Sequence, residues 1–187
     1  MSDPTHLLTV LTPDRRGIIA GITAVLDEAS ARLLELSQTV VHDYFTISMS
    51  VTLPASANLD NIKSQIQGLV AEGAAVTLLA HQAVKRQAIQ GECYFLTATG
   101  PDSPGLIHTI SEIVAGRGGN FNDLSSRVSD GKLSLVAEID LPGEVALEQL
   151  QIDLEHATAD SGLRVRLQHH RLFEATNEIA FRRLVNP

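Results

Sequence analysis

Two copies of a short Pro-Asp loop carry residue types that could bind a small anion. The first is Pro13-Asp14-Arg15-Arg16-Gly17, and the second is Pro101-Asp102-Ser103-Pro104-Gly105. Each loop follows a β-favouring run and precedes apolar residues at helical spacing, so we expect it to join a strand to a helix. The unpaired N–H groups and the partial positive charge of a helix start attract carboxylates and phosphates. The expected ligand contacts are Asp14, Arg15, Gly17 and Ile18 in the first copy, and Asp102, Ser103, Gly105 and Leu106 in the second.

The same loop residues also have an interpretation that involves no ligand. The aspartate could be the helix N-cap, Pro104 could stand near the first helical position, and the glycine could allow tight packing. Both interpretations stay open at the level of the sequence.

A second polar candidate is Asn120, which follows Gly118-Gly119 and precedes Phe121 at the start of an expected strand. A side-chain amide both donates and accepts, which suits a ligand that carries ammonium and carboxylate groups together. The backbone N–H groups near Gly105 and Leu106 would then bind the carboxylate, and Asn120 with backbone carbonyls would bind the ammonium. Alternatively, Asn120 satisfies a helix C-terminus or adopts a left-handed conformation.

Catalytic and metal-binding motifs are missing from the sequence. It has no Asp-x-Asp phosphatase pair, no Gly-x-Ser-x-Gly elbow and no Walker loop. The histidines are scattered, and the adjacent His169 and His170 would point to opposite faces of a strand. We expect the single cysteine, Cys93, to be a buried small hydrophobe rather than a nucleophile. These patterns predict a protein that is not an enzyme and that has no metal or cofactor.

An internal repeat organises the rest of the chain. Shifting the sequence by 88 positions aligns the two Pro-Asp loops, and the alignment continues without a gap to Pro54 over Pro142. Each copy reads as strand, helix, hairpin, helix, strand. The second copy's hairpin turn contains Asp130-Gly131, a pair that supplies the positive φ values of a two-residue turn. The apolar positions expected to shape the first copy are Ile18, Ile19, Ile22, Val25 and Leu26, then Phe45, Ile47, Met49, Val51 and Leu53, then Leu59, Ile62, Ile66, Leu69 and Val70, and the second copy's last helix should bury Leu147, Leu150, Leu154 and Ala157.

This order predicts an α+β fold of two tandem ferredoxin-like βαββαβ domains, each an antiparallel sheet with helices on one face. We expect domain 1 at residues 1–86, domain 2 at 87–170 and a C-terminal tail at 171–187, which could be a helix or an arm that pairs with another subunit. Apolar residues such as Val40, Val41, Phe45 and Ile47 suggest that something packs on the uncovered sheet face. A homodimer is therefore expected, and pairing of the two copies within one chain is the alternative.

The composition of the chain excludes some classes of binding partner. The 187 residues carry a net charge of −8, with 14 basic and 22 acidic residues and no long basic run, which argues against direct nucleic-acid binding. The longest apolar stretch is about half of the roughly 20 residues that cross a membrane. A single cysteine and an N-terminus unlike a signal peptide favour the cytoplasm. Small molecules or proteins are the expected partners.

The duplicated segments TPDRRGIIAGITAVL and GPDSPGLIHTISEIVAGRGGNFNDLSS resemble tandem ACT domains, a regulatory amino-acid-binding module. The similarity covers residues 6 to about 170, and the pair is similar to the regulatory ACT pair of phosphoserine phosphatases and to the glycine cleavage system transcriptional repressor family. The resemblance implies serine or glycine bound at an interface between ACT units. The family's loop maps onto residues 14–17 and 102–105, and its Gly-Ala-Asn-Ile element maps onto Gly118 to Phe121. Copy one departs from the pattern at Arg16 and Arg32.

Three functions stay open from the sequence. The first is an amino-acid sensor that regulates a protein partner by contact. The second is an assembly module that binds no ligand. The third is the sensory region of a serine-pathway phosphatase without its catalytic domain.

Overall fold

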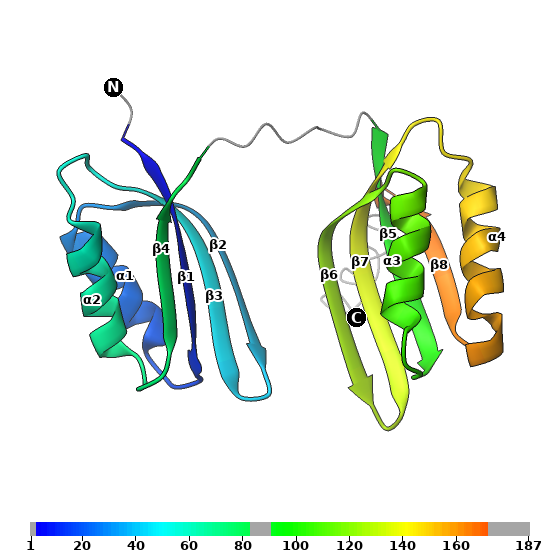
Figure 1. Ribbon diagram of the computed structural model, residues 1–187, viewed down its shortest axis with the longest axis horizontal. Helices are drawn as coiled ribbons and strands as arrows, with labels where there is room; N and C mark the ends of the chain where they lie inside the picture. The colour runs from blue at the N-terminus through cyan, green and yellow to red at the C-terminus, as the bar shows by residue number, and fades with distance from the viewer. Residues whose placement is uncertain (1–2, 83–90, 172–187) are drawn as a thin grey trace, which may run out of the picture. The chain divides into compact units, whose positions relative to one another are not determined.

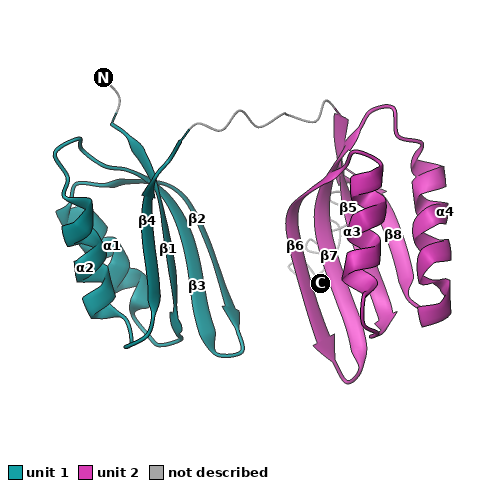
Figure 2. Ribbon diagram, viewed as in Figure 1, with its two compact units in different colours: residues 1–85 teal, residues 86–187 magenta. Residues whose placement is uncertain are grey.

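The computed structural model (Figure 1) describes residues 3–82 and 91–171. The chain divides into two compact units, residues 1–85 and residues 86–187 (Figure 2). The domain ranges 1–86, 87–170 and 171–187 stay predictions, and the predicted tail beyond Arg171 lies outside the described residues.

Unit 1 has the predicted order of strands and helices. Its elements are β1 (Thr5–Pro13), α1 (Ile18–Glu28), β2 (Arg32–Val41), β3 (Tyr44–Thr52), α2 (Leu59–Leu69) and β4 (Ala75–Ala80). The strands pair antiparallel in the order β2-β3-β1-β4. Both helices lie on one face of this sheet (Figure 1).

Unit 2 repeats the same arrangement. Its elements are β5 (Gly91–Pro101), α3 (Leu106–Gly116), β6 (Asn120–Ser129), β7 (Lys132–Pro142), α4 (Leu147–Thr158) and β8 (Arg164–His169), with a 3₁₀ turn at Ala159–Ser161. The strand order β6-β7-β5-β8 is again antiparallel throughout. The predicted α+β fold of two ferredoxin-like βαββαβ units is confirmed.

The core of each unit lies between the sheet and its two helices. The alternation predicted for β3 is confirmed, because every second residue from Phe45 to Leu53 is buried. Phe45 and Ile47 therefore belong to the core rather than to the uncovered face. Val41 lies on the uncovered side with 56% of its side chain exposed, whereas Val40 lies on the helix side of β2.

Two helix positions differ from the predicted core. Ile19 is 41% exposed, because it stands at the first turn of α1, beside the loop rather than over the sheet. Ala157 is exposed, and its neighbour Thr158 is buried in its place. The Thr158 hydroxyl donates to the carbonyl of Leu154 at 2.8 Å, which satisfies this polar group inside the core.

The hairpin turns have the same geometry in both units. Asp130 and Gly131 have φ values of 50° and 69°, which confirms the predicted two-residue turn. His42 and Asp43 adopt φ values of 47° and 64° at the equivalent position of unit 1. A bulge also repeats, between Leu33 and Glu35 in β2 and between Phe121 and Asp123 in β6.

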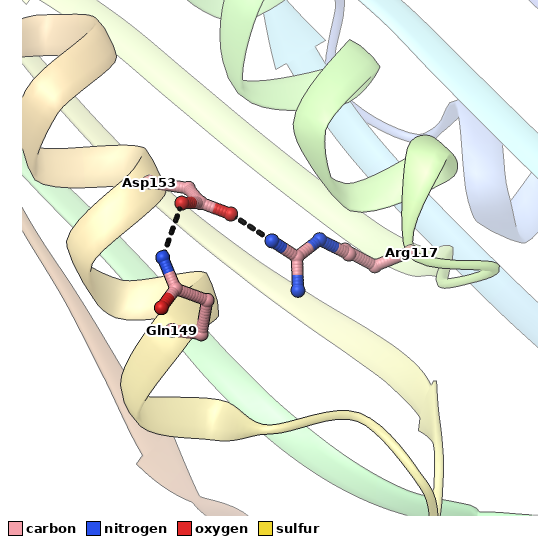
Figure 3. Close-up of polar contacts among 3 residues, drawn as sticks. All are labelled: Arg117, Gln149 and Asp153. Carbon is pink, nitrogen blue, oxygen red and sulfur yellow. Dashed lines mark hydrogen bonds and ion pairs between the residues drawn. The ribbon is translucent and has the colours of Figure 1, made fainter.

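An ion pair ties the two helices of unit 2 together. Arg117, the residue after α3, donates through Nη2 to Oδ2 of Asp153 on α4 (Figure 3). The other carboxylate oxygen of Asp153 accepts from Nε2 of Gln149 at 2.8 Å, one turn earlier in the same helix. About a third of each charged side chain is exposed, so the pair lies at the rim of the helix layer.

Candidate ligand site

The start of α1 and the start of α3 share an unusual cap. Gly17 and Gly105 are the N-cap residues, with left-handed φ values of 88° and 90°. The first helical hydrogen bonds run from Gly21 N–H to the Gly17 carbonyl and from Thr109 N–H to the Gly105 carbonyl, each at 2.9 Å. Neither cap makes a side-chain hydrogen bond, so the interpretation of the aspartates as N-caps is wrong. The glycines are required by the backbone conformation rather than by packing, since no protein atom would lie within 4 Å of an added Cβ.

The N-termini of the other two described helices, α2 and α4, are stabilised by side chains of the protein. The side chain of Asn58 caps α2 by accepting from Asn61 N–H at 3.0 Å, and Asp60 places a negative charge in its first turn. Glu148 places a negative charge in the first turn of α4 in the same way. Neither α1 nor α3 has an acidic residue in its first turn. An anion bound at these two starts would supply the charge that they lack.

Each Pro-Asp loop is held against the hairpin turn of its own sheet. The backbone N–H of Asp14 donates to the Asp43 carbonyl at 2.7 Å, and that of Asp102 donates to the Gly131 carbonyl at 2.9 Å. The start of the helix therefore lies at a fixed place, beside the end of β2 in unit 1 and of β6 in unit 2. A loop held in place by such a hydrogen bond can present its N–H groups at a lower entropic cost when a ligand binds.

In unit 1 the predicted residues surround one hollow of about 240 Å³. It is smaller than the roughly 300 Å³ at which pockets for drug-sized molecules begin. The four candidates of the first copy line it together with residues of α1, β2 and β3. The lining is Asp14, Arg15, Gly17, Ile18, Ile19, Ala20, Gln38, Val40 and Phe45.

Gln38 and Val40 are lining residues that the sequence analysis missed. Gln38 pairs with Ile47 across the β2–β3 hairpin, so it lies on the helix side of the sheet, between Leu36 and Val40. A polar residue inside an apolar alternation was the available signal. Unit 2 has Ser126 at the equivalent position.

The guanidinium of Arg15 already has a partner. Its Nη2 donates to the carbonyl of Leu69, the last residue of α2. A cation at this end stabilises a helix through its dipole and satisfies a terminal carbonyl. Arg15 therefore lines the hollow while its charge supports the neighbouring helix.

Asn120 and Phe121 lie far from the loop of their own unit. Asn120 pairs with Asp140 at one end of the sheet, whereas Asp102 contacts Gly131 at the other. The ten residues of β6 separate these ends by about 30 Å at roughly 3.3 Å per residue. One small ligand cannot touch both Gly105 and Asn120 of one unit, so the arrangement expected from the sequence is wrong within a unit.

The side chain of Asn120 is also not a helix cap. Its Nδ2 donates to the Phe121 carbonyl at 3.1 Å and to Oδ1 of Asn122 at 3.4 Å. The left-handed residue after α3 is Gly118, with a φ of 73°. Neither alternative role predicted for Asn120 is therefore observed.

Cys93 is half-buried rather than fully buried, and it is not activated. Burial raises the pKa of its thiol to about 12, helped by the hydrogen bond to Glu138 and by the negative charges of Glu138 and Asp140. A thiol with this pKa is protonated at neutral pH and is a poor nucleophile.

Within residues 3–82 and 91–171, no group of three or more His, Cys, Asp or Glu is placed to hold a metal ion. No helix in that part of the chain is long and apolar enough to cross a membrane.

Comparison with known families agrees with this geometry. The model of the ACT domain matches twice, over residues 5–77 and 93–168. The chain belongs to the ACT domain family. The two matches lie in the two units, so each βαββαβ unit is one ACT domain.

Related proteins match a single ACT unit. A UPF0237 protein of Clostridium acetobutylicum is 36% identical over 61 residues, which cover 32% of this chain and 68% of that protein. A UPF0237 protein of Methanopyrus kandleri is 35% identical over 81 residues, which cover 43% of this chain and 90% of that protein. The matched lengths are those of one ACT unit rather than of the pair.

Two solved structures share the paired fold. An unknown protein from Galdieria sulphuraria superposes with a TM-score of 0.74 and 19% identity, covering 89% of this chain and 98% of that one. A putative glycine cleavage system transcriptional repressor gives a TM-score of 0.63 and 15% identity, covering 88% and 96%. At these identities the likeness concerns the fold of the ACT pair alone.

Proposed function

We propose that this ACT protein is a sensor that binds a small amino acid, serine or glycine, and regulates a protein partner by contact. Membership in the ACT family supports a regulatory, ligand-binding role. The observation that carries the finer proposal is the hollow of unit 1, which opens at a helix start without a side-chain cap or an acidic residue.

The lining of the hollow matches the groups of an amino acid. The first N–H groups of α1, at Ile18 and Ile19, would bind the carboxylate. Asp14 brings a carboxylate and Gln38 a side-chain carbonyl to the same hollow, and both can accept from an ammonium group. The apolar residues Val40 and Phe45 complete a small wall, which favours a ligand with a short side chain.

Unit 2 would use its loop in the same way. Asp102, Ser103, Gly105 and Leu106 are the proposed contacts at the start of α3. Because Asn120 and Phe121 lie at the opposite end of the sheet of unit 2, they could reach a ligand only at the loop of a different ACT unit. We propose a homodimer, in which that ACT unit belongs to a second copy of the chain.

Regulation requires that the ligand bind one state of the protein more tightly than another. We propose that the amino acid acts by this means on a contact with a protein partner in the cytoplasm. The chain is acidic overall, so an effect on transcription would pass through that partner rather than through DNA. We propose no catalytic role and no cofactor.

Isothermal titration with serine and with glycine tests this proposal, beside a thermal-shift panel of other amino acids. Gly17→Val and Gly105→Val should each remove binding at its own loop, and the double variant should remove all saturable binding, because valine cannot adopt the left-handed φ of these caps without strain. Gly143→Val is the matched control, since its added Cβ meets no atom within 4 Å and its φ is not left-handed. If no amino acid binds or shifts the melting temperature, the sensor proposal fails and an assembly module takes its place.

A further inference from the structure

The Pro-Asp loop of unit 1 is tied to the end of α2 by two hydrogen bonds. The guanidinium of Arg15 donates through Nη2 to the carbonyl of Leu69, the last residue of α2. The hydroxyl of Thr12, near the end of β1, accepts from the backbone N–H of Ala71 at 3.4 Å. The loop that borders the hollow and the C-terminus of the second helix are therefore in direct contact.

The residues that make these two contacts differ between the repeated units. The shift of 88 positions that aligns the loops places Gly100 at the position of Thr12 and Ser103 at the position of Arg15. Glycine has no side chain that could accept a hydrogen bond. The serine hydroxyl stands directly on Cβ, whereas the arginine guanidinium stands at the end of a long stem. These two residues of unit 2 cannot form the same contacts.

The second helix of unit 2 ends on residues of its own turn. The hydroxyl of Ser161 donates to the carbonyl of Thr158, the last residue of α4, at 2.7 Å. The same hydroxyl accepts from the backbone N–H of Leu163 at 3.3 Å. The last carbonyls of a helix need partners from outside its own ladder. In unit 2 this partner comes from the residues after the helix, whereas in unit 1 it comes from the loop beside the hollow.

Leu69 also lies where α1 and α2 approach each other, side by side on the sheet of unit 1 (Figure 1). A Cβ built on Gly21 would lie 3.3 Å from Cδ1 of Leu69. The N–H of Gly21 closes the first turn of α1 by donating to the Gly17 carbonyl. The carbonyl of Leu69 thus holds the loop residue Arg15, and its side chain packs against the turn that follows this loop.

We propose that Arg15 transmits ligand binding in unit 1 by moving its hydrogen bond from the Leu69 carbonyl to the carboxylate of the bound amino acid. This inference rests on the proposed function, since it needs a ligand in the hollow. Arg15 lines that hollow while it contacts Leu69, so one side chain serves both places. A hydrogen bond to an ionised acceptor is roughly twice as strong as one between neutral groups, so the carboxylate is the preferred partner of the guanidinium.

The departure of Arg15 would loosen the end of α2. The last turn of this helix has no basic residue of its own. Without the guanidinium it loses both a donor for its terminal carbonyl and a cation that stabilises its dipole. The ligand-free state then has an ordered end of α2, and the ligand-bound state has an end that opens more often. A protein partner that contacts this end could distinguish the two states, as regulation requires.

The two ACT units have different tasks in this proposal. A ligand at the loop of unit 2 meets Ser103, which makes no contact of this kind with α4. The end of α4 keeps its bond to Ser161 whether or not the loop is occupied. Unit 1 therefore transmits ligand binding to its second helix, and unit 2 does not.

Hydrogen–deuterium exchange of the full chain, read by mass spectrometry, tests the transfer of the hydrogen bond. The chain is measured without ligand and with saturating serine or glycine, and titration calorimetry on the same samples measures binding. The ligand should slow exchange at the start of α1, residues 18–22. It should accelerate exchange at the end of α2, residues 66–71, by about fivefold, the effect of losing a cation at a helix C-terminus. The end of α4, residues 155–161, should not change.

Two matched variants separate the role of Arg15 from a general effect of charge. Arg15→Gln should accelerate exchange at residues 66–71 without any ligand, and a ligand should cause no further increase. Arg16→Gln makes the same change of charge at the next residue, which is exposed and does not line the hollow. This control should behave as the unaltered chain does.

The outcomes distinguish this inference from the sensor proposal on which it rests. If an amino acid binds but exchange at residues 66–71 does not accelerate, the role of Arg15 is wrong and the sensor proposal stands. Unchanged exchange at these residues in ligand-free Arg15→Gln overturns the role of Arg15 whatever the calorimetry shows. If neither serine nor glycine binds, both proposals fail together.

Discussion

The thiol of Cys93 donates a hydrogen bond to Oε1 of Glu138 across the β5–β7 pair, at an Sγ–Oε1 distance of 3.3 Å. Burial, this hydrogen bond and the nearby carboxylates together hold the thiol protonated, with a pKa of about 12. The single cysteine of the chain is thus kept protonated by its neighbours at neutral pH.

We predict that Cys93 reacts slowly with a maleimide at pH 8, and that Glu138→Gln accelerates labelling about tenfold. The substitution removes a charge that opposes thiolate formation, and each pKa unit changes the thiolate fraction tenfold. Burial, the largest cause of the shift, remains, so labelling should still be slower than in the unfolded chain. An unchanged rate would show that Glu138 does not control this thiol.

The raised pKa of the Cys93 thiol also predicts that the folded protein loses stability at alkaline pH. Above the ordinary thiol pKa of 9.0, the unfolded chain releases the proton of Cys93 while the folded chain keeps it until about pH 12. The free energy of unfolding therefore falls as pH rises through this range. Urea unfolding at pH 8, 9 and 10 measures the slope, and Cys93→Ser should reduce it. An equal slope in Cys93→Ser would contradict the shift.

Glycines 116 and 119 should respond in opposite directions to alanine. A Cβ on Gly119 would lie 2.7 Å from Cδ2 of Leu141 and 3.0 Å from the Val114 carbonyl, and both neighbours are buried. Gly119→Ala should lower the free energy of unfolding by about 1–3 kcal/mol through overpacking. Gly116 ends α3 with no atom within 4 Å of an added Cβ, so Gly116→Ala should raise it by up to about 1 kcal/mol. Urea titrations of both variants compare the signs.

The Arg117–Asp153 ion pair should contribute modestly to stability. Since about a third of each side chain is exposed, solvent screens the pair, and we expect a coupling of about 0.5–1 kcal/mol. A double-mutant cycle with Arg117→Gln and Asp153→Asn isolates the coupling from the separate bond to Gln149. The coupling should shrink at high salt. A coupling near zero at low salt would mean that α3 and α4 are held by packing alone.

The fold was predictable because its signals are local. The repeat, the helical spacing after each loop and the Asp130-Gly131 turn each depend on a few neighbouring residues. The position of Asn120 at the start of a strand was predicted, but its distance from the Gly105 loop was not, because a strand that follows a crossover helix starts at the end of the sheet opposite the preceding loop. Gln38 was missed because the bulge at Leu33/Glu35 shifts the alternation of β2 by one residue, so counting from Leu33, which lies on the helix side, puts Gln38 on the uncovered face.

Gln38 gives a sharp test of the hollow in unit 1. If its side-chain carbonyl accepts from the ammonium of the ligand, Gln38→Ala should weaken serine or glycine binding about tenfold, the effect of losing one hydrogen bond to a charged group. Thr39→Ala is the matched control, because Thr39 is the next residue of the same exposed strand but pairs with Thr46 on the uncovered side of the sheet. Titration calorimetry should then show weaker binding for the first variant and unchanged binding for the second. An equal loss of affinity in both variants would mean that any change in β2 weakens binding, and the proposed role of the Gln38 side chain would be wrong.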